Sequence, residues 1–276
     1  MNILITGGFG LIGRNLVSEL SKNNNFNIFL LSRNIKSNNA ARNIVTIDHN
    51  LLEQIPVEKI PKDINTVIHL AAIAHKTSSE IKAINCLMTK NITDAFINKK
   101  VKFIFFSSVA VYGEANRLFP IKVSDFCKPY SSYGIGKLKD EEIISSSFKY
   151  FTILRLCPVI EGDDTDLLKR VYLPKTKIKY RSSYNRVYSF LSHKTIFKTI
   201  NSILNENNLS NKTINLKDPS NYYESDILNK YEGKEIKLSI IISEPIFFIL
   251  NLFSFIPKIY TINCLLTKML KSNTYE

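Results

Sequence analysis

Residues 1–13 read MNILITGGFGLIG, and this stretch predicts the fold of the chain. The apolar, β-branched run at residues 2–6 predicts a buried strand. Gly7, Gly10 and Gly13 follow at G-x-x-G-x-x-G spacing, and the sequence then continues with helical periodicity. Glycines permit a sharp turn and a close approach to a pyrophosphate, while a helix N-terminus offers free N–H groups to the anion. This order of strand, glycine turn and helix predicts a dinucleotide-binding unit.

The end of the next expected strand, residues 26–31 (FNIFLL), bears on which dinucleotide binds. A site for the unphosphorylated dinucleotide usually ends this strand with Asp or Glu, which accepts a hydrogen bond from the ribose 2′-OH. Here Ser32 and Arg33 follow. An acid would repel a 2′-phosphate, whereas Ser and Arg can bind one. We therefore favour NADP as the cofactor, with NAD as the alternative.

Further strand and helix patterns alternate along the chain. Strand patterns lie at residues 43–47, 66–70, 102–106 and 151–156, and helical patterns include 79–98 and 133–146. Such alternation predicts an α/β fold, a Rossmann-type doubly wound parallel sheet whose ligands lie beyond the carboxyl ends of its strands. We expect a Rossmann domain at 1–156, a small C-terminal substrate-binding part at 157–235, interleaved with it, and an apolar helical segment at 236–276.

Composition limits the class of protein. The chain has 276 residues, 45% of them hydrophobic, which excludes a disordered chain. Four cysteines (Cys86, Cys127, Cys157, Cys264) lie far apart, which predicts no disulfide framework, no metal site and a cytoplasmic location. The net charge of +13 is compatible with nucleic acid, an anionic membrane surface, a polyanionic substrate or simple lysine drift. Because no nucleic-acid motif is present, we expect no nucleic-acid partner.

Polar residues with acid–base chemistry lie where two of these elements meet. Ser107 and Ser108 follow the strand KFIFF, and Tyr133 and Lys137 begin a helical pattern. Positions i and i+4 share a helix face, so the hydroxyl and the ammonium can act on one site. A free tyrosine has a pKa near ~10, and a neighbouring cation lowers it. The arrangement predicts general acid–base chemistry beside a hydride-transferring cofactor.

With these motifs in view, the chain resembles the extended short-chain dehydrogenase/reductases, in the branch of NAD-dependent epimerases and dehydratases acting on nucleotide sugars. The resemblance rests on TGGFGLIG, on FSSVAVYG and on YGIGK with its upstream Pro129, and it covers residues 1–220. It implies that Tyr133 is the acid/base, that Lys137 modulates it and binds ribose, and that Ser108 is the hydroxyl partner. Ser108 is preferred to Ser107 because it stands three residues before the VYG motif.

The resemblance also implies the remaining site residues. The expected cofactor-binding residues are Gly7, Gly10, Leu11, Ile12, Gly13, Ser32, Arg33, Asp48 at the adenine, Leu70, Ala71, Ala72, Tyr133 and Lys137. The expected substrate-binding residues are His75, Ser108 and Arg186, the last on a diphosphate; an anion-binding role for Lys177, Lys179 and Arg181 stays open. His69, Asn85 and Arg155 are expected to be structural.

The residues after Ser108 narrow the reaction. Family dehydratases place an Asp-Glu pair there, and two-centre epimerase-reductases use a cysteine, whereas this chain has Val109 and Ala110. The resemblance therefore implies a 4-epimerase or a 4-ketosugar reductase, in a subgroup of surface-polysaccharide synthesis whose substrates are nucleotide-linked or lipid-linked sugars. Arg33 favours the reductase. The alternative is a non-catalytic or regulatory dinucleotide-binding protein, favoured by Pro158, which stands where relatives carry a substrate-binding asparagine.

The C-terminal segment changes to an apolar character. Its uninterrupted run at residues 246–256 is too short to span a bilayer, and Pro245 and Pro257 predict helix boundaries on either side. Three roles stay open: a core helix, a helix lying in a membrane interface with nearby lysines on anionic lipid, and a partner-docking surface. A peripheral membrane contact and a homodimer are accordingly further expectations.

Overall fold

The computed structural model describes residues 1–33, 42–73, 80–113, 119–160, 172, 178–182, 185–206, 211–230, 232–238 and 240–276. Two compact units form. The first comprises Met1–Val111, Ser132–Arg155 and His193–Ile214, and the second comprises Tyr112–Ser131, Leu156–Ser192 and Asn215–Glu276. The two units interleave along the chain, because residues 112–131 belong to the second unit and residues 193–214 return to the first.

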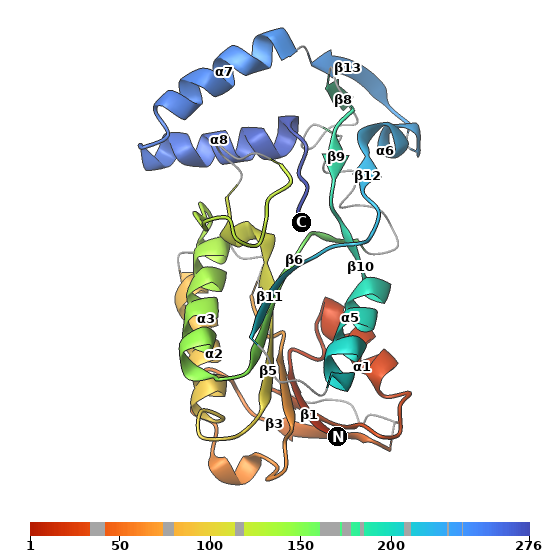
Figure 1. The fold of residues 1–276 in the computed structure, drawn as a ribbon, viewed down its shortest axis with the longest axis vertical. Helices are drawn as coiled ribbons and strands as arrows, with labels where there is room; N and C mark the ends of the chain where they lie inside the picture. The colour runs from red at the N-terminus through yellow and green to blue at the C-terminus, as the bar shows by residue number, and fades with distance from the viewer. Residues whose placement is uncertain are drawn as a thin grey trace. The chain divides into compact units, whose positions relative to one another are not determined.

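A seven-stranded sheet forms the centre of the first unit, in the order β11-β6-β5-β4-β1-β2-β3 (Figure 1). The strands are β1 (Asn2–Thr6), β2 (Asn27–Ser32), β3 (Ile44–Asp48), β4 (Thr66–His69), β5 (Lys102–Ser108), β6 (Phe151–Leu156) and β11 (Lys212–Leu216). The pairs β1–β2, β2–β3, β1–β4 and β4–β5 are parallel. The predicted Rossmann-type sheet is thereby confirmed. Its strand order reverses between β1 and β4, which is where such sheets bind ligands.

Helices cover this sheet in two packed pairs, which lie on opposite sides of it in Figure 1. One pair is α1 (Leu11–Leu20) with α5 (His193–Asn205), and the other is α2 (Glu80–Asp94) with α3 (Ser132–Ser147). Short 3-10 turns, η1 (Val57–Lys59) and η2 (Val109–Val111), follow β3 and β5. The central strand β1 is buried along most of its length because helices cover both faces. The burial explains its unbroken apolar sequence.

The second unit contains three two-stranded sheets. They pair β7 (Val159–Ile160) with β10 (Leu191–Ser192), β9 (Val187–Tyr188) with β12 (Tyr222–Tyr223), and β8 (Ile178–Ser182) with β13 (Lys234–Leu238). Its helices are α6 (Glu224–Lys230), α7 (Ile240–Leu252) and α8 (Pro257–Leu270). A small core of Tyr188, Phe190, Ile227 and Leu228 packs between β9 and α6. The four two-residue strands β7, β9, β10 and β12 carry little periodicity, and the sequence analysis predicted none of the strands of this unit.

The apolar C-terminal segment forms two helices, and one predicted boundary is wrong. The helix α8 starts at Pro257, as expected, but α7 continues through Pro245. The proline removes one backbone hydrogen bond, and the burial of Phe247 two residues later helps to offset that loss. On the same helix Phe248 is 71% exposed. Among the helices of the described residues, none combines the length and apolarity needed to cross a membrane.

Candidate active site

The glycine turn between β1 and α1 has the geometry of a phosphate-binding loop. Gly7 has a φ of +71°, and a Cβ there would lie 2.6 Å from the Ala71 nitrogen. A Cβ on Gly13 would lie 2.1 Å from the Gly7 carbonyl oxygen. Gly10 forms the N-cap of α1 without a side-chain hydrogen bond, and the first turn of α1 carries no acidic residue. The helix N-terminus is thus suited to an anion.

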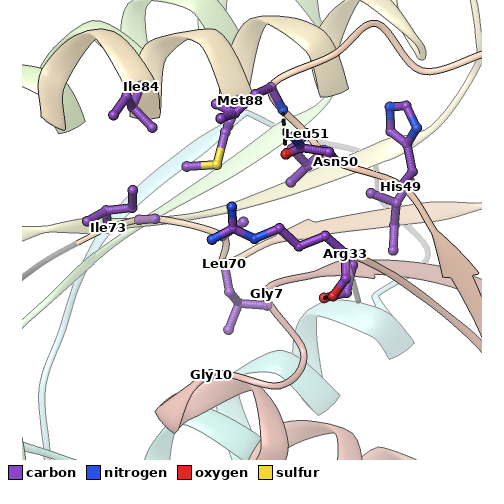
Figure 2. Close-up of a pocket in the computed structure, with 15 residues that line it drawn as sticks. Gly7, Gly10, Arg33, His49, Asn50, Leu51, Leu70, Ile73, Ile84 and Met88 are labelled. Carbon is purple, nitrogen blue, oxygen red and sulfur yellow. Dashed lines mark hydrogen bonds between the residues drawn. The ribbon is translucent and has the colours of Figure 1, made fainter. Parts of the chain in front are cut away.

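A cavity of about 230 Å³ opens beside this turn (Figure 2). Seven predicted cofactor residues line it: Gly7, Gly10, Ser32, Arg33, Leu70, Ala71 and Ala72. The predicted Leu11, Ile12 and Gly13 lie in the first turn of α1, immediately after the Gly10 cap. The cavity joins the glycine turn to the ends of β2 and β4, so it lies beside the reversal of strand order, where folds of this class bind a dinucleotide.

Sequence reasoning missed part of the cavity wall. The additional lining residues are Leu31, His49, Asn50, Leu51, Leu52, Ile73, Ile84 and Met88. The predicted Asp48 ends β3 and is exposed, while the four residues that follow it line the cavity. Their place directly after a strand was a usable signal, but Ile84 and Met88 come from α2, whose approach to the cavity depends on tertiary packing.

Arg33 is one of the residues that line the cavity, and its role on a 2′-phosphate stays a prediction. Its side chain runs from the end of β2 into the cavity (Figure 2). Ser32 pairs in register with Asp48 of β3, so an acidic side chain ends the neighbouring strand rather than β2 itself. The cavity edge therefore carries a guanidinium where an NAD site usually carries a carboxylate.

The two serines at the end of β5 have different environments. Ser107 is buried and donates a hydrogen bond to Glu141, whose carboxylate also binds Arg155 with an Nη2–Oε2 distance of 2.8 Å. Ser108 is half-buried, and its Oγ accepts a hydrogen bond of 3.2 Å from the Ala110 nitrogen. The expected structural role of Arg155 is thus seen directly. Since Glu141 engages Ser107, Ser108 is the better placed of the two serines for a reacting group.

Tyr133 lies near the start of α3 with its hydroxyl beside Ser108. Burial raises the pKa of Tyr133 to about 12, its hydrogen bond with Ser108 lowers that pKa, and nearby Asp140 raises it. The phenol is therefore protonated at neutral pH in this structure. The predicted Ser108 and Tyr133 are brought together from β5 and α3.

Lys137 lies one turn further along α3 and is 2% exposed. Its Nζ donates a hydrogen bond of 2.7 Å to the Phe106 carbonyl and lies 6.0 Å from the centre of the Tyr133 ring. Burial lowers the pKa of Lys137 to about 8, while Asp140 and Glu141 raise it. An ammonium that titrates near neutral pH beside a phenol is suited to proton transfer.

His69 is fully buried, in agreement with its expected structural role. Its Nδ1 lies 2.6 Å from Thr6 Oγ1, and its Nε2 lies 3.1 Å from Thr89 Oγ1. Burial, and then Lys137, lower the pKa of His69 to about 3, so the ring is neutral. Asn85 is also structural: its amide holds both backbone polar groups of Ile73, at 2.9 and 3.1 Å.

The predicted substrate residues are only partly described. His75 lies outside the described residues, as does Lys177. In the second unit Arg186 is fully buried, forms an ion pair with Glu224 and stacks on Tyr180 at 4.8 Å. Its role on a substrate diphosphate stays a prediction, because Glu224 holds its guanidinium in this structure. Lys179 donates to the Leu228 carbonyl.

Comparisons with known proteins agree with this site. Over 152 residues the chain is 35% identical to a Methanocaldococcus jannaschii protein provisionally named UDP-glucose 4-epimerase, a match covering 51% of this chain and 49% of that protein. It is 29% identical over 157 residues to the UDP-glucose 4-epimerase of Vibrio cholerae, covering 51% and 45%. The matches thus span about half the length of these curated relatives.

A solved structure extends the likeness in fold. UDP-glucuronic acid 4-epimerase from Bacillus cereus, in complex with NAD, matches with a TM-score of 0.68 at 21% identity, covering 87% of each chain. The model of the NAD dependent epimerase/dehydratase family matches residues 3–165, which hold the glycine turn, Ser108, Tyr133 and Lys137. By this match over more than half its length, the chain belongs to the NAD dependent epimerase/dehydratase family.

Proposed function

We propose that this protein is a nicotinamide-dependent 4-epimerase of a UDP-sugar. The observation that carries the proposal is the meeting of Ser108, Tyr133 and Lys137 in the unit that holds the glycine turn and its cavity. Relatives named UDP-glucose 4-epimerase and a Bacillus cereus UDP-glucuronic acid 4-epimerase of the same fold support the sugar class. The absence of an Asp-Glu pair after Ser108 is consistent with chemistry at one carbon.

The residues divide the reaction between them. When bound, the nicotinamide cofactor supplies a hydride acceptor and donor for C4 of the sugar. Tyr133 takes the proton of the 4-OH as C4 is oxidised and returns it after the ketosugar has turned over. Ser108 donates a hydrogen bond to the oxygen at C4, because its hydroxyl adjoins that of Tyr133. Lys137, together with the positive charge that a bound oxidised nicotinamide would add, lowers the pKa of Tyr133 and favours the phenolate form that this step requires.

The test is turnover of UDP-glucose, UDP-glucuronic acid and UDP-N-acetylglucosamine with NAD, followed by proton NMR of the sugar. A 4-epimerase interconverts the C4 epimers without net consumption of cofactor. We expect Tyr133→Phe to abolish turnover while cofactor affinity stays within about twofold, since only the hydroxyl is removed. If no UDP-sugar changes configuration, the proposal is wrong.

A second candidate is a 4-ketosugar reductase that uses NADP, and Arg33 is the observation that favours it. The guanidinium points into the cavity where a 2′-phosphate can be bound in bidentate fashion (Figure 2). A reductase would oxidise NADPH in stoichiometric amounts with a 4-keto-6-deoxy sugar nucleotide and leave UDP-glucose unchanged. The two activities are therefore separated by cofactor consumption alone.

A further inference from the structure

Two buried carboxylates on α3 follow Lys137 by one turn, and they are neutralised differently. Glu141 is held by Arg155 at 2.8 Å and accepts a hydrogen bond from Ser107. Asp140 is 1% exposed, and within the described residues no donor reaches its Oδ1. A carboxylate buried in this way is costly unless a cation or several donors compensate it. The charge near Asp140 that favours its ionised form is that of Lys137.

A chain of hydrogen bonds points toward Asp140. The Ala71 N–H donates to Thr6 Oγ1 at 3.4 Å, so the Thr6 hydroxyl is free to donate to His69 Nδ1 at 2.6 Å. His69 is neutral, so its Nε2–H donates to Thr89 Oγ1 at 3.1 Å. The Thr89 hydroxyl then donates to Asp140. The direction follows from the far end of the chain: an ionised carboxylate only accepts, so Thr89 donates to Asp140 and accepts from His69 Nε2–H, which leaves His69 Nδ1 to accept from Thr6.

This placement gives Asp140 a role that neither the motifs nor the family match assigns. We propose that Asp140 is a positioning residue of the catalytic site, the buried counter-charge that keeps the Lys137 ammonium protonated beside Tyr133. It touches no reacting atom and acts through Lys137. Its consequence for catalysis rests on the proposed function, whereas its effect on Lys137 does not.

The remaining ionisable groups around Asp140 leave Lys137 as its partner. Those of the described residues are Tyr133, Lys139 and Glu141 on α3, Lys82 and Cys86 on α2, His69 on β4 and Arg155 on β6. Glu141 and Arg155 neutralise one another. Burial raises the pKa of the Cys86 thiol to about 11, and His69 is neutral, so neither carries charge at pH 7. Lys139 is exposed and Lys82 half-buried, so water screens both more than it screens Lys137.

The sign of the coupling follows from Coulomb's law. Burial lowers the pKa of Lys137 to about 8, and Asp140 is the largest of the influences that raise it. Removing the carboxylate charge therefore makes Lys137 lose its proton at lower pH, by roughly one unit or more. Lys137 would then be largely neutral at pH 7.5, and the phenolate of Tyr133 would lose its counter-ion.

The direct test is an NMR titration of protein labelled with ¹³C at lysine Cε, in the parent and in Asp140→Asn, with Lys137→Met to assign the signal. We expect the Lys137 midpoint near pH 8 in the parent to fall by about one unit in Asp140→Asn. The matched control is Glu142→Gln, which removes the same charge from an exposed position of α3 and should leave the midpoint unchanged. An unchanged midpoint in Asp140→Asn overturns the proposal.

The catalytic readout is the pH dependence of kcat and kcat/KM with the UDP-sugar that the protein turns over. In Asp140→Asn the alkaline limb, where Lys137 loses its proton, should move to lower pH by about one unit, so that kcat falls about twofold at pH 7 and about tenfold at pH 9 with KM unchanged. Asp140→Glu should restore much of the parent profile. A shifted Lys137 midpoint with an unshifted profile overturns the positioning role. Should the parent show no turnover, the proposed function fails and the titration still decides the charge of Lys137.

Discussion

Replacing Gly13 by alanine should destroy the dinucleotide site, whereas the same change at Gly136 should not. Both glycines lie inside helices of the first unit, Gly13 in α1 and Gly136 in α3. Helix propensity alone predicts that each Gly→Ala change stabilises by about 1 kcal/mol. The surroundings of the new methyl group decide whether that gain is realised.

The distances separate the two cases. A Cβ on Gly13 would lie 2.1 Å from the Gly7 oxygen and 2.7 Å from the Gly8 Cα, while a Cβ on Gly136 meets nothing nearer than the Lys82 Cα at 3.4 Å. The Gly13 overlap is with backbone, so the turn itself must move by about 1 Å to reach van der Waals contact. Overpacking of this kind costs about 1–3 kcal/mol. We expect Gly13→Ala to lower the free energy of unfolding by about 2 kcal/mol, and Gly136→Ala to raise it by up to about 1 kcal/mol.

The assay combines urea unfolding followed by circular dichroism with calorimetric titration of NAD and NADP. Gly13→Ala should unfold at lower urea and bind either dinucleotide at least tenfold more weakly, about 1.4 kcal/mol, because the displaced turn no longer approaches the pyrophosphate. Gly136→Ala serves as the matched control. If Gly13→Ala keeps the parent affinity and midpoint, or if Gly136→Ala loses as much, the close-approach argument is refuted.

Three further predictions concern acid stability, cofactor choice and the C-terminal helices. Stability should fall by about 2 kcal/mol between pH 7 and pH 5, because the folded state keeps His69 neutral down to a pKa of about 3 while the unfolded state binds a proton near its ordinary value. Urea unfolding of the parent and of His69→Gln at several pH values checks this. An equal dependence of the unfolding free energy on pH in the two proteins would contradict it. Arg33→Ala should weaken NADP at least tenfold and leave NAD nearly unchanged, and equal losses in calorimetry would contradict the role of Arg33. If the C-terminal helices lie in a membrane interface, the parent protein should sediment with anionic vesicles. Phe248→Ser and Phe255→Ser should abolish this binding, because the parent side chains are 71% and 77% exposed. A parent protein that does not sediment with the vesicles would contradict the membrane role.

Helices α2 and α3 show which features of the candidate site follow from local sequence pattern and which follow from packing. The periodicity of residues 133–146 predicted α3 within one residue at each end, and the i, i+4 spacing placed Tyr133 and Lys137 on one face. The choice of Ser108 over Ser107 came from a motif, and the structure supplies its physical reason, which is that Glu141 engages Ser107. No motif pointed to Asp140. Its partners Thr89 and Cys86 come from α2, which only the folded chain brings beside α3.

The C-terminal half was less predictable for a different reason. The strands β7, β9, β10 and β12 are only two residues long, too short for any periodicity to appear. The strand β11 joins the sheet beside β6, and α5 packs on α1, through contacts between segments far apart in sequence. Pro245 also misled the boundary of α7, which continues through the proline, and Phe247 on its far side is buried.

The sequence alone was enough to predict the βαβ start and the parallel sheet, because strand and helix periodicity and glycine geometry are local properties. It also singled out Ser108, Tyr133 and Lys137 as candidate site residues, through their motifs. Tertiary structure alone decided the charge states. Whether His69 is neutral and whether Lys137 titrates near pH 8 depend on burial by other elements. Asp140 and Glu141 follow Lys137 on the same helix, and only folding pairs Glu141 with Arg155 of β6, which leaves Asp140 as the proposed counter-charge of Lys137.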